Sequence, residues 1–401
     1  MDKKEITPLL LGLDLGAYSM AIAFHLATGG VSHAIGREPL GATMYSKIIV
    51  PHVVRDIFDP TRAVSVIKEF AEKHESVLLV PCEDWYVRLV SAIGHLLPEN
   101  VKFHLPDARL LDMVSDKSKF YDLLDGFGID YPKTAVFYSA DQVTDRLLSL
   151  FDYPAVVKPS DSSEYWRFPF EGMKKVYFPQ SRTEAAEIIK RIFASGYGAS
   201  VILQQKMSAA DEHVGVYTVI TDKCARCVGG VFGDVMLGEP TPSGTGNHVA
   251  IITRKKPEIC KKLDRFLERI GYTGIANFDL IFNGDKWYVL ELNPRQGRSS
   301  DYMRGAGVNI ASVLVDVIYG GEVSGFEYGE SFWRAVSKKT LYSYCPHVHM
   351  LAEAQILSSL GAESYLYGYR ADTVRNPIRC AYSLYHAYRH NRRFAKYGAV
   401  N

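Results

Sequence analysis

Short apolar runs alternate along the chain with amphipathic segments, beginning within the first thirty residues. Residues 9–13 and 77–80 are almost wholly apolar, as expected for strands buried on both faces of a parallel sheet. Each run leads through a polar turn into a helical pattern, over about 18–26 and 85–96. This alternation predicts an α/β fold, and it places Asp14, Glu83 and Asp84 at the ends of strands, where ligands of open parallel sheets collect. Helix capping is an equally good interpretation of these acids.

The middle of the chain predicts further elements separated by long loops. A helix should begin beside Asp116 and end near Gly126, followed by an extended proline segment. Two stretches, 160–175 and 233–246, lack regular apolar spacing and predict loops of a length that is usually functional or mobile. Around them we expect helices over 141–151, 183–194, 257–270 and 306–319, and strands over 155–158, 176–178, 201–205, 214–221 and 228–233.

The strongest local signal is a hairpin near residue 284. Two alternating apolar runs, 274–282 and 286–292, flank Asn283, Gly284 and Asp285. Asn-Gly between such runs is a strong signal for a tight turn between antiparallel strands. The sequence therefore predicts two paired strands here.

Composition excludes several classes of protein. The chain has 401 residues, 47% of them hydrophobic, which indicates more than one domain with sizeable cores. Its 46 Lys and Arg balance 45 Asp and Glu, so no overall charge favours nucleic acid or an anionic membrane. Asp14 interrupts the first apolar stretch, and no later run is long enough to cross a bilayer, which predicts a cytoplasmic protein. Six scattered cysteines fit reduced thiols, and the single CxxC of Cys224 and Cys227 is better explained by a hairpin turn than by zinc.

Candidate chemistry gathers on the predicted hairpin. Asp279 and Glu291 lie on opposite strands, and Asn293, two residues beyond Glu291, points to the same face. Carboxylate and amide oxygens suit Mg²⁺, which takes the rest of its ligands from water and phosphate. Arg295 follows two residues later and Arg298 three after that, so guanidinium groups would stand beside a metal–phosphate site. A solvated acidic face is the alternative for the two acids alone.

Two lysines and an apolar strand complete a candidate nucleotide site. Lys117 opens a helix and Lys158 ends a strand, and both could meet phosphate oxygens. The strand over 201–207 runs into a polar segment, which offers the apolar slot and backbone groups that a purine needs. A carboxylate at 211–212 could bind ribose hydroxyls.

The order of these parts resembles the ATP-grasp superfamily, and specifically its carboxylate–amine ligases. The resemblance covers about residues 75–320 and rests on DKSKFYDLLDGFGIDYPKT, AVVKP, ILQQKM with DEH, and FDLIFNGDKWYVLELNPRQGRSS, in that order. It implies a two-lobed body that uses ATP and Mg²⁺. The implied roles are ATP phosphate binding by Lys117 and Lys158, adenine binding by Gln205, Lys206 and Met207, ribose binding by Glu212, magnesium binding by Asp279, Glu291 and Asn293, and stabilisation of an acyl phosphate by Arg295. This chain departs from the pattern at Gln205, where an acid is common, and in a covering loop poor in glycine.

Within the superfamily, the stretch from LLVPCEDWYVRL to DKSKFYDLL is similar to the D-aspartate ligase group. That similarity implies an enzyme that joins aspartate to an amine of a nucleotide-linked peptidoglycan precursor, through an acyl phosphate. A dipeptide or small-amine ligase, and a non-catalytic ATP-binding regulatory module, are the alternatives. Arg298, Arg304 and the loop 241–248 are candidates for substrate selection, and His248 for proton transfer, each against a purely structural role.

These observations together predict four parts. They are a Rossmann-like domain over 1–113, a small ATP-grasp lobe over 114–199, a large lobe with the catalytic site over 200–322, and a helical, basic C-terminal extension over 323–401. Residues 375–401 contain six Lys or Arg and no acid. This tail is a candidate for contact with a membrane surface or an anionic precursor, and a solvated helix packed by its tyrosines is the alternative.

Overall fold

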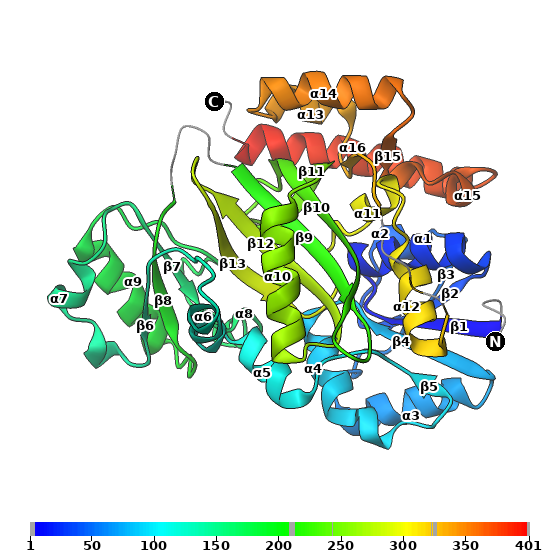
Figure 1. Cartoon of the computed structure of the whole chain (residues 1–401), viewed down its shortest axis with the longest axis horizontal. Helices are drawn as coiled ribbons and strands as arrows, with labels where there is room; N and C mark the ends of the chain where they lie inside the picture. The colour runs from blue at the N-terminus through cyan, green and yellow to red at the C-terminus, as the bar shows by residue number, and fades with distance from the viewer. Residues whose placement is uncertain (1–4, 208–212, 243, 322, 324–326, 399–401) are drawn as a thin grey trace.

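The computed structural model describes residues 5–207, 213–242, 244–321, 323 and 327–398. Their strands form three sheets (Figure 1). The largest sheet lies in the middle, a three-stranded sheet lies at one end of the molecule, and a five-stranded sheet lies at the other. None of the described helices is both long and apolar enough to span a bilayer.

The five-stranded sheet is parallel throughout, with strand order β3-β2-β1-β4-β5. This order confirms the expected Rossmann-like arrangement. Leu9 and Leu79, on neighbouring strands, are almost fully buried, which explains their continuous apolar runs. The elements are β1 (Ile6–Leu11), α1 (Leu15–Thr28), β2 (Ser32–Gly36), α2 (Gly41–Met44), β3 (Ile49–Val53), α3 (Pro60–Ala71), β4 (Ser76–Pro81), α4 (Asp84–Ile93), η2 (Gly94–Leu96) and β5 (Val101–Lys102).

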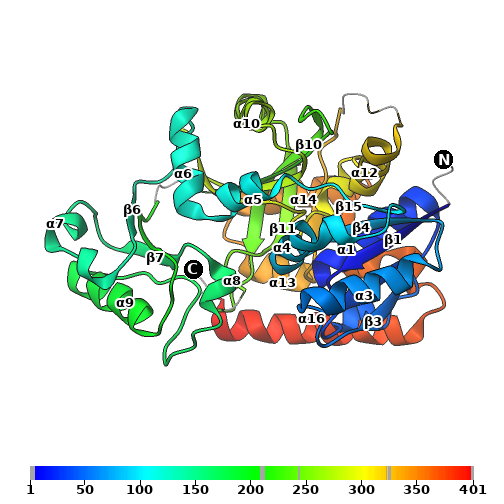
Figure 2. The ribbon, with the colours of Figure 1, turned by 90° about the horizontal axis from the view of Figure 1, so that it is seen from below.

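The three-stranded sheet is antiparallel, with order β6-β8-β7, and α9 packs against it. Phe137, Val157 and Ile189 belong to its buried core. Figure 2 shows this sheet and its helices set apart from the five-stranded sheet, with α5 and α6 on the side that leads to the large sheet. The elements of this region are α5 (Ala108–Ser115), α6 (Lys117–Gly126), β6 (Thr134–Phe137), η3 (Ala140–Gln142), α7 (Asp145–Leu148), β7 (Ala155–Pro159), α8 (Ser162–Tyr165), α9 (Arg182–Ala194) and β8 (Val201–Gln205).

The seven-stranded sheet has the order β13-β12-β9-β10-β11-β14-β15 and is antiparallel except between β14 and β15. The predicted hairpin is confirmed, because β12 pairs with β13. In the turn, Gly284 has φ 93°, and Asn283 Oδ1 accepts hydrogen bonds from the backbone amides of Asp285 and Lys286. The elements are β9 (His213–Thr221), β10 (Cys227–Gly238), β11 (His248–Arg254), α10 (Pro257–Ile270), β12 (Gly274–Phe282), β13 (Trp287–Asn293), α11 (Tyr302–Gly305), α12 (Ile310–Tyr319), β14 (Phe332–Arg334) and β15 (Glu363–Tyr365).

The C-terminal part is mostly helical, but it also contributes β14 and β15 to the large sheet. Its helices are α13 (Lys338–Tyr344), α14 (Val348–Ser359), η4 (Leu366–Gly368), α15 (Arg370–Thr373) and α16 (Pro377–Tyr397). The long helix α16 contacts α2 of the N-terminal region as well as α13 (Figure 1). The last eighty residues are therefore built into the body of the protein. The four domain limits given above stay a prediction.

Several predicted elements differ in the structure. The single helix expected over 141–151 is wrong: the chain forms η3 and the four-residue α7, because Thr144 caps a new start by accepting a hydrogen bond from Leu147 N. The helix expected over 306–319 begins at Ile310, where Asn309 caps it. Residues 176–178 form only an isolated bridge, through Tyr177. The loop expected over 160–175 contains α8, and β10 covers the first six residues of the loop expected over 233–246.

Candidate active site

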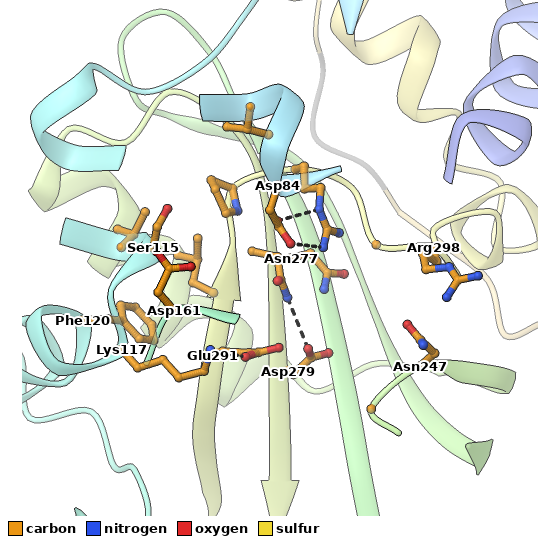
Figure 3. A pocket seen from close by; sticks show the side chains of 18 of the residues that line it. Asp84, Ser115, Lys117, Phe120, Asp161, Asn247, Asn277, Asp279, Glu291 and Arg298 are labelled. Atoms are coloured by element: carbon orange, nitrogen blue, oxygen red, sulfur yellow. Dashed lines mark hydrogen bonds and ion pairs between the residues drawn. The ribbon is translucent and has the colours of Figure 1, made fainter. Parts of the chain in front are cut away.

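The hairpin of β12 and β13 brings two carboxylates together. Asp279 is the direct cross-strand partner of Glu291, and a bulge follows Asp279. Asn293 Nδ2 donates to Asp279 Oδ2 at 3.3 Å, and His248 Nε2 lies 3.2 Å from Asp279 Oδ1. Figure 3 shows the Asp279 and Glu291 side chains next to each other on the wall of a cavity. The structure thus gathers all three predicted metal-ligand residues, together with His248.

The lysines reach the same place from two other elements. Asp116 caps α6 by accepting hydrogen bonds from Ser118 N and Lys119 N, which fixes Lys117 as its first residue. Lys117 Nζ then lies 3.0 Å from Glu291 Oε2. Lys158, on β7, donates to Gln204 Oε1 at 3.0 Å. Lys158 shares a cavity with Lys117, Asp279 and Glu291, so both predicted lysines belong to the site of the carboxylates.

These charged groups shift one another's pKa values. Lys117 holds the pKa of the Glu291 carboxyl well below its usual range, against the effect of burial. Burial would lower the pKa of Lys117, but Glu291 outweighs it and raises that pKa. Burial, and then repulsion by Lys117, lower the pKa of Lys158 to about 8. Burial raises the pKa of Asp279, opposed by His248. The site therefore holds an ionised carboxylate beside two cationic groups.

Arg295 follows β13 and is held by the N-terminal region. Its Nε lies 2.8 Å from Asp84 Oδ1, and its Nη2 donates to Asp84 Oδ2 at 2.9 Å. Asp84 is the first residue of α4, so the predicted position of this acid at a strand end is confirmed. Burial would lower the pKa of Arg295, but Asp84 raises it. Arg298 Nε lies 3.6 Å from Asp14 Oδ2, so both arginines connect the large sheet to acids of the parallel sheet.

Two neighbouring cavities, which share part of their lining, surround these groups. The smaller one, of about 150 Å³, is lined by Asp84, Lys117, Asp279, Glu291, Asn293, Arg295 and Arg298, among others (Figure 3). The larger one, of about 770 Å³, lies between the small and large sheets and shares Lys117, Asp279 and Glu291. Its lining includes Lys158, Leu290, Val214 and Met236, and the C-terminal residues Tyr344 and Phe394. A volume of this size accommodates a drug-sized or nucleotide-sized ligand.

The comparison with known proteins gives the family. Residues 114–299 match the family model of the ATP-grasp domain. D-aspartate ligase of Enterococcus faecium (strain Aus0004) is 30% identical over 360 residues, which cover 86% of each chain. The chain belongs to the ATP-grasp carboxylate–amine ligases. It is therefore an enzyme that forms carbon–nitrogen bonds with ATP and Mg²⁺.

Solved structures show the same fold. An ADP complex of N5-carboxyaminoimidazole ribonucleotide synthetase superposes with a TM-score of 0.61 at 14% identity, covering 82% of this chain and 81% of that one. An L-amino acid ligase from Bacillus licheniformis superposes with a TM-score of 0.55 at 13% identity, covering 80% of this chain and 78% of that one.

The residues of this ATP-grasp ligase fit magnesium. Within the described ranges no group of three or more His, Cys, Asp or Glu is placed to hold a metal ion. Asp279, Glu291 and Asn293 instead offer two carboxylates and one amide, a set of hard oxygens that leaves positions for phosphate and water. The ion pair with Lys117 shows that the Glu291 carboxylate faces a positive charge in the cavity, as a ligand of a bound cation would.

Some predicted residues of the ligase lie elsewhere. Gln205 and Lys206 are exposed at the end of β8, and neither they nor Met207 line the two cavities as described. Glu212 lies outside the described residues. Arg304 turns away from the site to Asp301, 2.7 Å from its Nε, so it is structural. Cys224 and Cys227 lie in and beside the turn between β9 and β10, where Ala225 has φ 62°, as the hairpin interpretation expects.

The sequence did not reveal other residues of the ligase site. Lys175 lines both cavities and helps to lower the pKa of Glu291. Arg88 of α4 lies 2.8 Å from Asp161 Oδ2 and joins the parallel sheet to the small sheet's loop. Lys175 lies in a segment without a recognisable motif. Arg88 lies in the stretch that is similar to the D-aspartate ligase group, but nothing local marks it as a site residue, and only the tertiary arrangement brings the two residues to the cavity.

Proposed function

We propose that the protein is an ATP-dependent amide ligase that activates the carboxylate of aspartate as an acyl phosphate and transfers it to an amine of a nucleotide-linked peptidoglycan precursor. The observation that carries the ligase chemistry is the pairing of Asp279 with Glu291 in one cavity with Lys117 and Lys158. The choice of aspartate and of the precursor is supported by the relative named D-aspartate ligase.

Residues of the chain would divide the work as follows. Lys117 and Lys158 would hold the phosphates of ATP, and Asp279, Glu291 and Asn293 would hold Mg²⁺, which supplies charge neutralisation at the phosphates. On the family resemblance, Gln205, Lys206 and Met207 would border adenine, although none of the three lines the two described cavities, and Glu212 would bind ribose. Arg295 would stabilise the charge of the transferred phosphoryl group and Arg298 would bind the donor carboxylate.

The reaction then has two balanced steps. An oxygen of the donor carboxylate attacks the γ-phosphorus, and ADP leaves. The amine nitrogen attacks the acyl carbon, the bond from that carbon to the phosphate oxygen breaks, and phosphate and the amine proton are released. Arg295 is fixed by Asp84 before substrate binds, so its guanidinium needs little reorganisation during the first step.

Hydroxylamine tests the first step, because it traps an activated carboxylate as a hydroxamate. We expect the wild-type protein to form aspartyl hydroxamate with MgATP. Glu291→Gln should abolish this turnover, and Arg295→Ala should lower it by about a hundredfold or more, the scale for losing one charge-stabilising donor. Glu258→Gln, on the exposed face of α10, is the matched control and should leave turnover unchanged. Normal turnover by Glu291→Gln would contradict the metal assignment.

A substrate panel distinguishes the proposed ligase, whose acceptor is a peptidoglycan precursor, from the alternative of a dipeptide or small-amine ligase. Phosphate release is measured with each D- and L-amino acid, with and without a muropeptide precursor. We expect release to depend on aspartate and on the precursor together. Equal release with free amino acids as acceptors would favour the dipeptide ligase.

A further inference from the structure

A third cavity, of about 410 Å³, adjoins the catalytic one. Asn247, His248 and Arg298 line both cavities, so a molecule in the third cavity extends to the place where the donor carboxylate would react. The catalytic cavity itself has only about 150 Å³. The larger neighbour therefore has room for a substrate that the reaction cavity cannot enclose.

One face of α16 forms a wall of this cavity. Tyr382, His386, Arg389 and Arg393 follow one another at intervals of four, three and four residues, and all four line it. Residues at this spacing lie on the same side of a helix. Opposite walls come from the parallel sheet's region and from the large sheet, through residues such as Leu40 and Trp333. Helix α16 therefore closes a cavity between the N-terminal region and the large sheet.

The cavity is positively charged. Arg389 and Arg393 form no ion pair with any residue that the structure describes, and Arg298 shares its charge with Asp14. Among the described lining residues the carboxylate is that of Glu239, which accepts a hydrogen bond from His390. Burial would raise the pKa of Glu239, but His390, Thr241 and the nearby Arg393 outweigh it and lower that pKa. Burial, His390 and Arg393 lower the pKa of His386 to about 3, so this histidine is neutral.

We infer that this cavity binds the amine acceptor, and that Arg389 and Arg393 select an acceptor with an anionic group, a carboxylate or a phosphate, set apart from its amine. The inference rests on the proposed ligase function and names its second substrate. An acceptor whose anionic group lies against α16 can extend its amine past Arg298 and His248 into the reaction cavity. Tyrosine and tryptophan side chains of the lining supply apolar contacts for the part between.

The same geometry bears on the basic tail. Of its basic residues, Arg389 and Arg393 lie on the face of α16 that borders the cavity, whereas Arg392 does not line it. Both side chains are exposed, so their guanidinium groups are open to an anionic molecule that enters the cavity.

Kinetics with three synthetic acceptors test the inference. All contain one free lysine amine: a peptide with a free C-terminal carboxylate, its C-terminal amide, and the amide with an added phosphoserine. In the wild type we expect the KM of each anionic peptide to be at least about tenfold below that of the neutral amide, the scale of one charged hydrogen bond. In Arg393→Gln and Arg389→Gln this preference should fall to about twofold or less, while the KM for aspartate and ATP stays unchanged. Whichever anionic peptide is preferred identifies carboxylate or phosphate as the group recognised.

Arg392→Gln is the matched control, because Arg392 is an exposed neighbour outside the cavity. It should keep the wild-type preference, and Arg393→Lys should restore most of it. A wild type that does not distinguish the three peptides, an Arg392→Gln variant that loses the preference equally, or a change in the KM for aspartate would each overturn the inference. Hydroxamate formation without any peptide reports on the proposed function separately, and direct titration of the peptides onto the protein with MgADP bound tests the cavity even where turnover fails.

Discussion

Glu83 lies at the junction of the two regions that the arginines connect. Burial and the nearby charge of Asp14 raise its pKa to about 7, although Arg295 and Arg298 oppose them. The folded protein therefore binds this proton more tightly than the unfolded chain does. The resulting contribution to stability is complete below the ordinary pKa of 4.5 and is lost as the pH rises towards 7.

Glu83→Gln removes this titration and should stabilise the protein at alkaline pH. At pH about 8, we expect its free energy of unfolding to exceed that of the wild type by on the order of 3 kcal/mol, since the shift from 4.5 to about 7 is about 2.5 pKa units and each unit corresponds to about 1.4 kcal/mol. At pH about 4 the advantage should disappear, because wild-type Glu83 is then protonated in both states. Urea denaturation at the two pH values measures the difference. A constant difference at both would contradict the shifted pKa.

At the scale of single residues, the sequence identified those parts of the site whose positions depend on local spacing. Asp279, Glu291 and Asn293 were found because the turn signal places them on two paired strands. The exact pairing of Asp279 with Glu291 could not be predicted, because it depends on the bulge that follows Asp279. The ion pair of Arg295 with Asp84 could not be found in this way. It joins residues 211 positions apart, and it depends on how two sheets pack.

Elements with strong local signals were likewise predictable, and those without them were not. The β12–β13 hairpin has both alternation and turn chemistry, whereas β14 and β15 have three residues each and become strands only by joining the edge of a larger sheet. The contact between α2 and α16 also has no local signal in the sequence. Gly41 opens α2, and a Cβ placed on it would lie 2.0 Å from Cε2 of Tyr382.

Gly41→Ala therefore tests how closely these two helices approach. The added methyl group must displace the Tyr382 ring, and we expect a loss of about 1–3 kcal/mol in the free energy of unfolding, as for other overpacked contacts. In a Tyr382→Ala background the same substitution should cost less than about 0.5 kcal/mol. Urea denaturation of the wild type, the two single variants and the double variant gives the coupling free energy between Gly41 and Tyr382. Equal costs in both backgrounds would mean that the helices are not in this contact in solution.

At the scale of the whole molecule, a buried ion pair fastens the C-terminal part to the N-terminal part. Arg379 and Asp372 are both fully buried, with Arg379 Nε 3.2 Å from Asp372 Oδ2. Asp372 also accepts hydrogen bonds from Tyr18 Oη at 2.8 Å and from Lys47 N at 2.6 Å, and Arg379 Nη1 donates to Ala42 O at 3.1 Å. Because Arg379 lies at the start of α16, this cluster sets the position of the helix that borders the acceptor cavity.

Breaking this pair should affect stability and acceptor binding together. Arg379→Met leaves the Asp372 charge buried without its partner, so we expect a loss of about 3–5 kcal/mol in the free energy of unfolding. The double variant Arg379→Met with Asp372→Asn removes both charges and should recover at least about half of that loss, because no unpaired charge remains. If α16 is displaced in the single variant, the KM for the anionic peptide acceptor should rise while hydroxamate formation, which needs no peptide, continues. Strictly additive stability effects, or parallel loss of both activities in a folded variant, would show that the cluster does not act by positioning α16.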